Sequence, residues 1–162
     1  ALNRYWNRNI FLIFGVSGLI GAAFEFAVSW FMETAFGIIA WDYSGTFLNI
    51  QGRTNFAFFC AWGFLGLMWV KVFLPSVLRL VDAIPIRWRI ALTSIFAVFM
   101  IADGLMTLIT VDCWYQREAG QAPQTTIEQF CANHFDDDFM AQRFQSMDMD
   151  PSRAQRVEDP RP

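Results

Sequence analysis

The chain has 162 residues, of which 55% are apolar and 17% aromatic, and its formal net charge is −3. A slight excess of negative charge does not fit a nucleic-acid-binding protein, which needs a basic surface. The sequence contains no Gly-rich phosphate loop, no dinucleotide fingerprint and no Gly-x-Ser-x-Gly turn. We therefore predict that it is not an enzyme and that it has no cofactor, metal or nucleic-acid partner.

Three long apolar segments follow one another, at about residues 10–39, 55–74 and 89–111. An apolar run of roughly 20 residues is typical of a membrane-spanning helix. The runs are continuous and do not alternate with a period of two, which favours helices over barrel strands. The sequence therefore predicts an all-α polytopic membrane protein with about three transmembrane helices in contact with the lipid bilayer. The first run is longer than a bilayer needs, so we expect it to tilt or to end in an interfacial turn.

Polar segments flank and follow this transmembrane domain at residues 10–111. Residues 1–9 form an N-terminal flank, and residues 41–53 form a short interfacial loop between the first two spans. Residues 112–149 are predicted to form a polar tail outside the membrane with one short helix. Residues 150–162 are rich in proline and charge, and we predict that they are disordered.

Lysine and arginine predict the orientation of the chain. Arg4 and Arg8 precede the first span, and Arg87 and Arg89 lie between the second and third spans. Cytoplasmic loops of membrane proteins carry an excess of basic residues. We therefore expect a cytoplasmic N-terminus, with the first loop and the tail on the outer side.

Two cysteines, Cys113 and Cys131, fall in the predicted tail. An oxidising outer compartment permits disulfides, so a bridge between them is one expectation and two free thiols are the other. Cys131 and His134, with the three aspartates after them, could also bind a metal. No second Cys/His pair gives a zinc-type spacing, and a solvated turn is the preferred interpretation.

Ionisable residues within and beside the apolar segments are the candidate functional residues. Glu25, Ser29 and Glu33 are spaced by four, on one face of the first span. A carboxylate at the bilayer centre costs about 2.5–3.5 kcal/mol and usually faces a partner or a water-filled cavity. Arg53 enters the second span, and Asp103 lies in the third. We expect a shared polar interface of these residues, either as a transport pathway or as structural ion pairs such as Glu33 with Arg53.

The order of these residues resembles a known family. The loop carries Trp-Asp-Tyr-Ser and then Asn-x-x-Gly-Arg, formed by Trp41, Asp42, Tyr43, Ser44, Asn49, Gly52 and Arg53. This order resembles the CmpB-like bacterial membrane proteins, labelled "putative ABC-transporter type IV". The resemblance also includes Glu25-Phe26-x-x-Ser29-Trp30-x-x-Glu33 before the loop, and Trp62-Gly63-x-x-Gly66, Pro75 and Asp103 after it. The tail from Phe135 to Met147 is also similar to that family's end.

The resemblance implies a multi-pass protein of the bacterial inner membrane, with further spans upstream of Ala1 in the longer family members. It implies a transport function of unknown substrate, for which a permease component is our first interpretation, and a separate ATPase subunit is one candidate partner. The alternative is a non-catalytic accessory subunit that packs its helices against a homo-oligomer or a larger membrane complex. A pathway would place the carboxylates at a water-filled cavity, whereas an accessory subunit would leave them paired and sealed.

Overall fold

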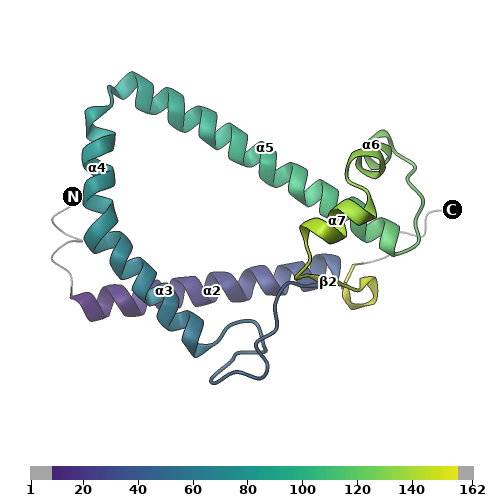
Figure 1. Ribbon diagram of the computed structural model, residues 1–162, viewed down its shortest axis with the longest axis horizontal. Helices are drawn as coiled ribbons and strands as arrows, with labels where there is room; N and C mark the ends of the chain where they lie inside the picture. The colour runs from purple at the N-terminus through teal and green to yellow at the C-terminus, as the bar shows by residue number, and fades with distance from the viewer. Residues whose placement is uncertain (1–8, 157–162) are drawn as a thin grey trace. The chain divides into compact units, whose positions relative to one another are not determined.

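The computed structural model of this chain describes residues 9–156. It contains two compact units, and the long helices α2 (Ile10–Phe36) and α5 (Ile86–Glu118) each take part in both (Figure 1). The first unit is the chain up to Ala27 with Tyr43–Ala97, and the second is Val28–Asp42 with the chain from Val98 onward. From Tyr43 onward, the loop between the first two spans therefore belongs with the first two-thirds of α2, and the tail belongs with the last third of α2 and most of α5.

Helix α2 has 27 residues and is the first of the long apolar helices. It begins after Asn9, whose side-chain oxygen accepts the Phe11 N–H at 2.9 Å, as N-cap residues do. It ends where Gly37 takes a positive φ of 64° and donates its N–H to Glu33 O at 2.8 Å. A left-handed glycine is a common helix end, so α2 ends slightly earlier than the sequence predicts.

The second long helical segment continues through Pro75. It consists of α3 (Phe56–Met68), the π-helical turn η1 (Trp69–Phe73) and α4 (Leu74–Ala83). Pro75 has no N–H to donate, and in a regular α-helix its ring clashes with the carbonyl four residues earlier. In the preceding turn the Leu74 N–H donates to Trp69 O, five residues earlier, which is the wider spacing of a π turn. The wider turn accommodates Pro75, so the helix continues past the end predicted at Leu74.

Helix α5 has 33 residues, a length of about 50 Å, whereas the hydrocarbon core of a bilayer is about 30 Å thick. Arg89 fixes the turn that precedes it. Its Nε donates to Ile84 O at 2.8 Å, and its Nη1 lies 3.2 Å from Asp82 Oδ1. At the other end, α5 extends past the predicted boundary at residue 111, and its last turns are buried in the second unit.

Within residues 9–156, three helical segments are long and apolar enough to cross a membrane: Ile10–Phe36, Phe56–Ala83 and Ile86–Glu118. Many of their apolar side chains are exposed on the protein surface, for example Phe11 at 78% and Leu19 at 65%. Apolar surface of this extent is unfavourable in water and favourable in lipid. The predicted all-α polytopic membrane fold is confirmed.

The second unit has a core of its own beside the ends of the two long helices. Its tail elements are α6 (Thr126–His134), α7 (Asp137–Arg143), β2 (Asp148–Met149) and the 3-10 turn η2 (Pro151–Arg153). The buried core residues are Phe36, Ile38, Val111, Trp114, Tyr115 and Met140. The tail thus contains two short helices, where the sequence analysis expected one.

The last segment of the chain is ordered further than the sequence predicts. Strand β2 pairs antiparallel with β1 (Ile38–Ile39), with Ile38 opposite Met149. The Asp150 N–H donates to Gly37 O at 3.1 Å, and the Gln155 N–H donates to Thr34 O at 2.9 Å. These main-chain bonds fix residues 150–156, which were predicted to be disordered. Residues 157–162, covered by the same prediction, lie outside the described residues.

Candidate functional site

A polar site in the first unit is centred on Glu25, in α2. Thr54 Oγ1 donates to Glu25 Oε2 at 2.9 Å, and Tyr43 Oη donates to Glu25 Oε1 at 3.3 Å. Glu25 is 7% exposed and Thr54 is 3% exposed. A buried carboxylate is costly unless its oxygens accept hydrogen bonds, and here each oxygen has a donor. Both donors belong to the loop between α2 and α3, so the site attaches this loop to α2.

Asn49 fixes the shape of that loop. Its Nδ2 donates to Ser44 O at 3.0 Å and to Thr46 O at 2.9 Å, and its Oδ1 accepts the Gly52 N–H at 3.1 Å. Gly52 has a φ of 69°, a left-handed conformation that favours glycine. Its carbonyl accepts the Tyr43 N–H at 2.8 Å. Asn49 and Gly52 of the loop motif therefore set the loop geometry that aims Tyr43 at Glu25.

The Tyr43 side chain is fixed by a ring contact as well as by its hydroxyl. Its ring stacks on Phe58 in α3, with centroids 4.7 Å apart and an interplanar angle of 21°. Burial raises the pKa of Tyr43 above its usual value of 10, and the negative charge and hydrogen bond of Glu25 raise this pKa further. The phenol therefore keeps its proton, and its role as donor, at neutral pH.

Arg53 lies beside the same part of α2. Its guanidinium carbon is 5.8 Å from the centre of the Phe26 ring, within the range of a cation–π contact. Phe26 is the neighbour of Glu25, so the structure brings Arg53 to the turn that carries the carboxylate. The predicted ion pair of Arg53 with Glu33 stays a prediction, because Glu33 belongs to the second unit.

The other predicted polar residues, Ser29, Glu33 and Asp103, belong to the second unit. Ser29 is buried at 4% exposure, and Asp103 is exposed. The pKa of Arg153 is raised, first by a hydrogen bond to Asp148 and to a smaller extent by the charge of Glu33. Glu33 thus interacts electrostatically with an arginine of the tail. The shared interface of all the predicted residues stays a prediction.

Thr54 is the site residue that the sequence analysis missed. It lies between Arg53 and Asn55, the N-cap of α3. Nothing in a loop threonine indicates contact with a carboxylate 29 residues earlier, although Thr54 directly follows the loop motif. Trp41 and Asp42 of that motif belong to the second unit, where Trp41 is half-buried and Asp42 is exposed.

Helices α2 and α3 pack closely at glycines on both helices. A β-carbon on Gly18 would lie 2.7 Å from Phe59 Cε2, and one on Gly63 would lie 2.9 Å from the Phe14 ring. Real β-carbons essentially never approach other atoms so closely. Small residues allow membrane helices to approach each other in this way. The two helices therefore form a close-packed hairpin.

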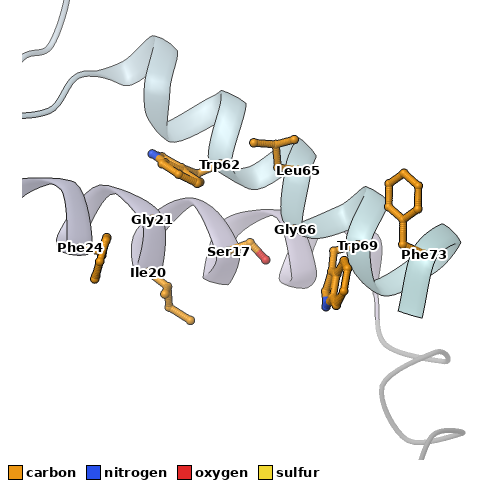
Figure 2. Close-up of a pocket in the computed structure, with 9 residues that line it drawn as sticks. All are labelled: Ser17, Ile20, Gly21, Phe24, Trp62, Leu65, Gly66, Trp69 and Phe73. Carbon is orange, nitrogen blue, oxygen red and sulfur yellow. The ribbon is translucent and has the colours of Figure 1, made fainter. Parts of the chain in front are cut away.

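An apolar groove of about 550 Å³ lies along this hairpin (Figure 2). Small residues, Ser17, Gly21 and Gly66, line it where the helices meet. Aromatic residues line it as well, and Figure 2 shows Trp62 packed over α2 beside Gly21, with Trp69 farther along, in η1. Ser17 is the only polar side chain among its lining residues. A groove of this kind suits apolar groups and does not form a polar path.

Cys113 and Cys131 lie together in the second unit. Cys113, in α5, is 4% exposed and Cys131, in α6, is 0% exposed, and their thiols are close enough to interact. Both are free cysteines in the structure, so the predicted bridge stays a prediction. His134, which the sequence analysis considered as a metal ligand together with Cys131, stacks on the Phe130 ring with centroids 4.4 Å apart. This contact gives His134 a packing role.

Comparison with known families assigns the chain to a family. The family model described as "Putative ABC-transporter type IV" matches residues 1–108 of the chain. The chain belongs to this family. Within this transporter-type family match lie α2, the loop, the Glu25 site and the hairpin groove. The match ends before the tail, so the likeness of the tail to the family's end stays a prediction. No curated protein and no solved structure matches this chain.

Proposed function

We propose that this chain is a non-catalytic membrane subunit that packs against other helices in a transporter-type assembly. The closed environment of Glu25 carries the proposal. Both carboxylate oxygens accept hydrogen bonds from buried or half-buried hydroxyls, and the residue is 7% exposed. A carboxylate on a transport path exchanges protons or ions with water. Glu25 instead attaches a loop to a helix, which is a structural role.

The depth of Glu25 along α2 supports this interpretation. Glu25 lies eleven residues before Phe36, the end of α2, which corresponds to about 16 Å of helix. Irregular backbone exposed to lipid does not occur within the hydrocarbon region, so a loop between two spans lies near the membrane surface. Because this loop is bonded to Glu25, we expect that carboxylate also to lie toward the surface, with the last turns of α2 beyond it, which would lower the cost of its charge.

The surface of the hairpin also favours a packing role. The groove between α2 and α3 is lined almost entirely by apolar side chains, and two of them, Ile20 and Phe24, are 65% and 67% exposed. Membrane helices associate through close van der Waals packing at such surfaces. The hairpin therefore offers a large apolar surface to lipid and to neighbouring helices.

A permease component is the second candidate function, and the family match favours it. In this case Glu25 would contact the transported species, and its hydrogen bonds with Thr54 and Tyr43 would have to open. The two candidates differ in the effect of Glu25→Gln. This substitution would remove or alter pH-dependent flux in a permease component, and it would only weaken the loop in a packing subunit.

The test is purification of the native protein in nanodiscs, followed by mass spectrometry of everything that stays bound. We expect a membrane-protein partner in fixed ratio to this chain, retained in Glu25→Gln and in the control Asp138→Asn, an exposed carboxylate of the tail. ATP-driven flux by this chain and an ATPase alone, abolished by Glu25→Gln and unaffected by Asp138→Asn, would overturn the proposal and support the permease component.

A further inference from the structure

The loop between α2 and α3 exposes three apolar side chains at its tip. Phe47 is 74% exposed, Leu48 is 63% exposed and Ile50 is 58% exposed. Clustered exposed apolar residues mark a surface that contacts something other than water. The tip therefore has the composition of a contact site, at the end of a loop whose base is bonded to Glu25.

The backbone of the tip is held in an unfavourable conformation. Leu48 has a φ of 49° and Gln51 has a φ of 53°, a region that costs non-glycine residues about 1–3 kcal/mol and persists only where the surroundings fix it. Here the three hydrogen bonds of the Asn49 side chain fix it, together with Asn55 Nδ2, which donates to Thr46 Oγ1 at 2.9 Å. The loop is thus fixed in a shape that leaves its apolar side chains outside.

The apolar surface of the tip continues onto a membrane helix. The Phe47 ring packs edge-on against Phe56, the first residue of α3, with centroids 6.1 Å apart. Phe56 is itself 47% exposed and stacks on Phe59. Helix α3 begins one of the three segments that are apolar enough to span a membrane. The apolar surface of the tip is therefore continuous with a helix surface that lipid surrounds. This continuity identifies lipid as the contact of the tip.

We propose that Phe47, Leu48 and Ile50 insert into the lipid of the membrane interface as a fixed anchor. Apolar side chains bury about 5–10 Å into the boundary of headgroups and acyl chains in interfacial segments. The partner is a lipid surface and not a soluble protein or a second copy of this chain. The anchor would set the depth of the loop, and with it the depth of Glu25.

The depth of the tip can be measured in the full chain in lipid nanodiscs. Spin labels are placed at Leu48→Cys and at the control Gly45→Cys, in a background with the three native cysteines replaced by serine. Gly45 is an exposed residue of the same loop with no atom near its Cβ position. We expect the ratio of oxygen to aqueous nickel-chelate collisions to be several-fold higher at position 48 than at position 45. Equal ratios would place the tip in water and overturn the proposal.

A second measurement keeps the native cysteines and does not depend on the serine background. Phe47 is replaced by the photoreactive residue p-benzoylphenylalanine, and the illuminated protein is analysed by mass spectrometry. Adducts with the mass of nanodisc phospholipid support insertion. Cross-links to a second copy of this chain, or no adduct beyond that of the same residue at Gly45, would overturn it. Asn49→Ala should also raise the mobility of the label at position 48, because it removes the bonds that fix the tip.

Discussion

Thr54 and Glu25 are 29 residues apart in the chain, yet Thr54 Oγ1 lies 2.9 Å from Glu25 Oε2. With the bond from Tyr43, this contact attaches both ends of the loop to one turn of α2. Glu25, a charged residue in an apolar helix, therefore holds the loop in its folded conformation. The two donors can be removed one at a time, which makes their contributions measurable.

Thr54→Val should destabilise the protein by about 1–3 kcal/mol, because a buried carboxylate oxygen loses its donor while the shape of the side chain is kept. Unfolding in detergent, followed by circular dichroism, measures the change. Thr93→Val is the control, since Thr93 is an exposed residue of α5, and we expect no change from it. Equal stability of the two variants would show that the Thr54 contact contributes nothing.

The ionisation of Tyr43 should occur above pH 10, because burial and then Glu25 raise its pKa. A raised folded-state pKa stabilises the protein below the unfolded value of about 10, and this contribution is lost as the pH rises through the folded-state value. Phenolate absorbance follows the titration in a background with Tyr5→Phe and Tyr115→Phe. Adding Glu25→Gln should lower the midpoint partly, since burial remains. A midpoint that does not respond to Glu25→Gln would contradict the contact.

Gly66→Ala should weaken the α2–α3 hairpin by about 1–3 kcal/mol, the typical cost of overpacking. A methyl group on Gly66 would overlap the Ser17 side chain, whereas one on Gly104 would have no atom within 4 Å. Gly104→Ala is therefore the matched control in a helix, and we expect it to stabilise the protein by about 0.5–1 kcal/mol. The two variants should shift the unfolding midpoint in opposite directions, and a shift in the same direction would refute the close approach.

Cys113 and Cys131 should form a disulfide in protein taken from an oxidising compartment, since both are buried and their thiols are close enough to interact. Alkylation in denaturant without reductant should then modify Cys60 alone, and alkylation after reduction should modify all three cysteines. Mass spectrometry counts the added groups. Three alkylated cysteines without reductant would show that the pair stays reduced and would remove one argument for an outer tail.

The membrane fold could be predicted from the sequence because hydrophobicity along the chain is a local signal. The runs around Leu19, Phe64 and Phe99 are each long enough for a bilayer span, and a helix is the structure that satisfies their backbone there. Helix ends were less predictable. Pro75 indicated a break, but a π turn upstream of it keeps the helix continuous, and that adjustment has no signature in the sequence.

The contacts of the site could not be predicted, because they join residues that are far apart in the chain. The spacing of Glu25 and Glu33 places them on one helical face, but the structure gives Glu25 its donors from a loop. The order of the chain end also depends on a distant partner, since Met149 is fixed by pairing with Ile38. Polar composition alone indicates disorder. It gives no sign that a distant two-residue strand, β1, pairs with this segment and orders it.

The pairing of Ile38 with Met149 sets an order of events during synthesis of the chain. Strand β1 leaves the ribosome long before its partner strand, and the second and third apolar segments, Phe56–Ala83 and Ile86–Glu118, are made in between. Domains of nascent chains generally fold from the N-terminus onward, and contacts between distant residues form late. The α2–α3 hairpin can therefore assemble before the tail residues that bury Phe36 and Ile38 have been synthesised. A chain released before Met149 would keep its membrane hairpin and leave that surface open to quality-control proteases.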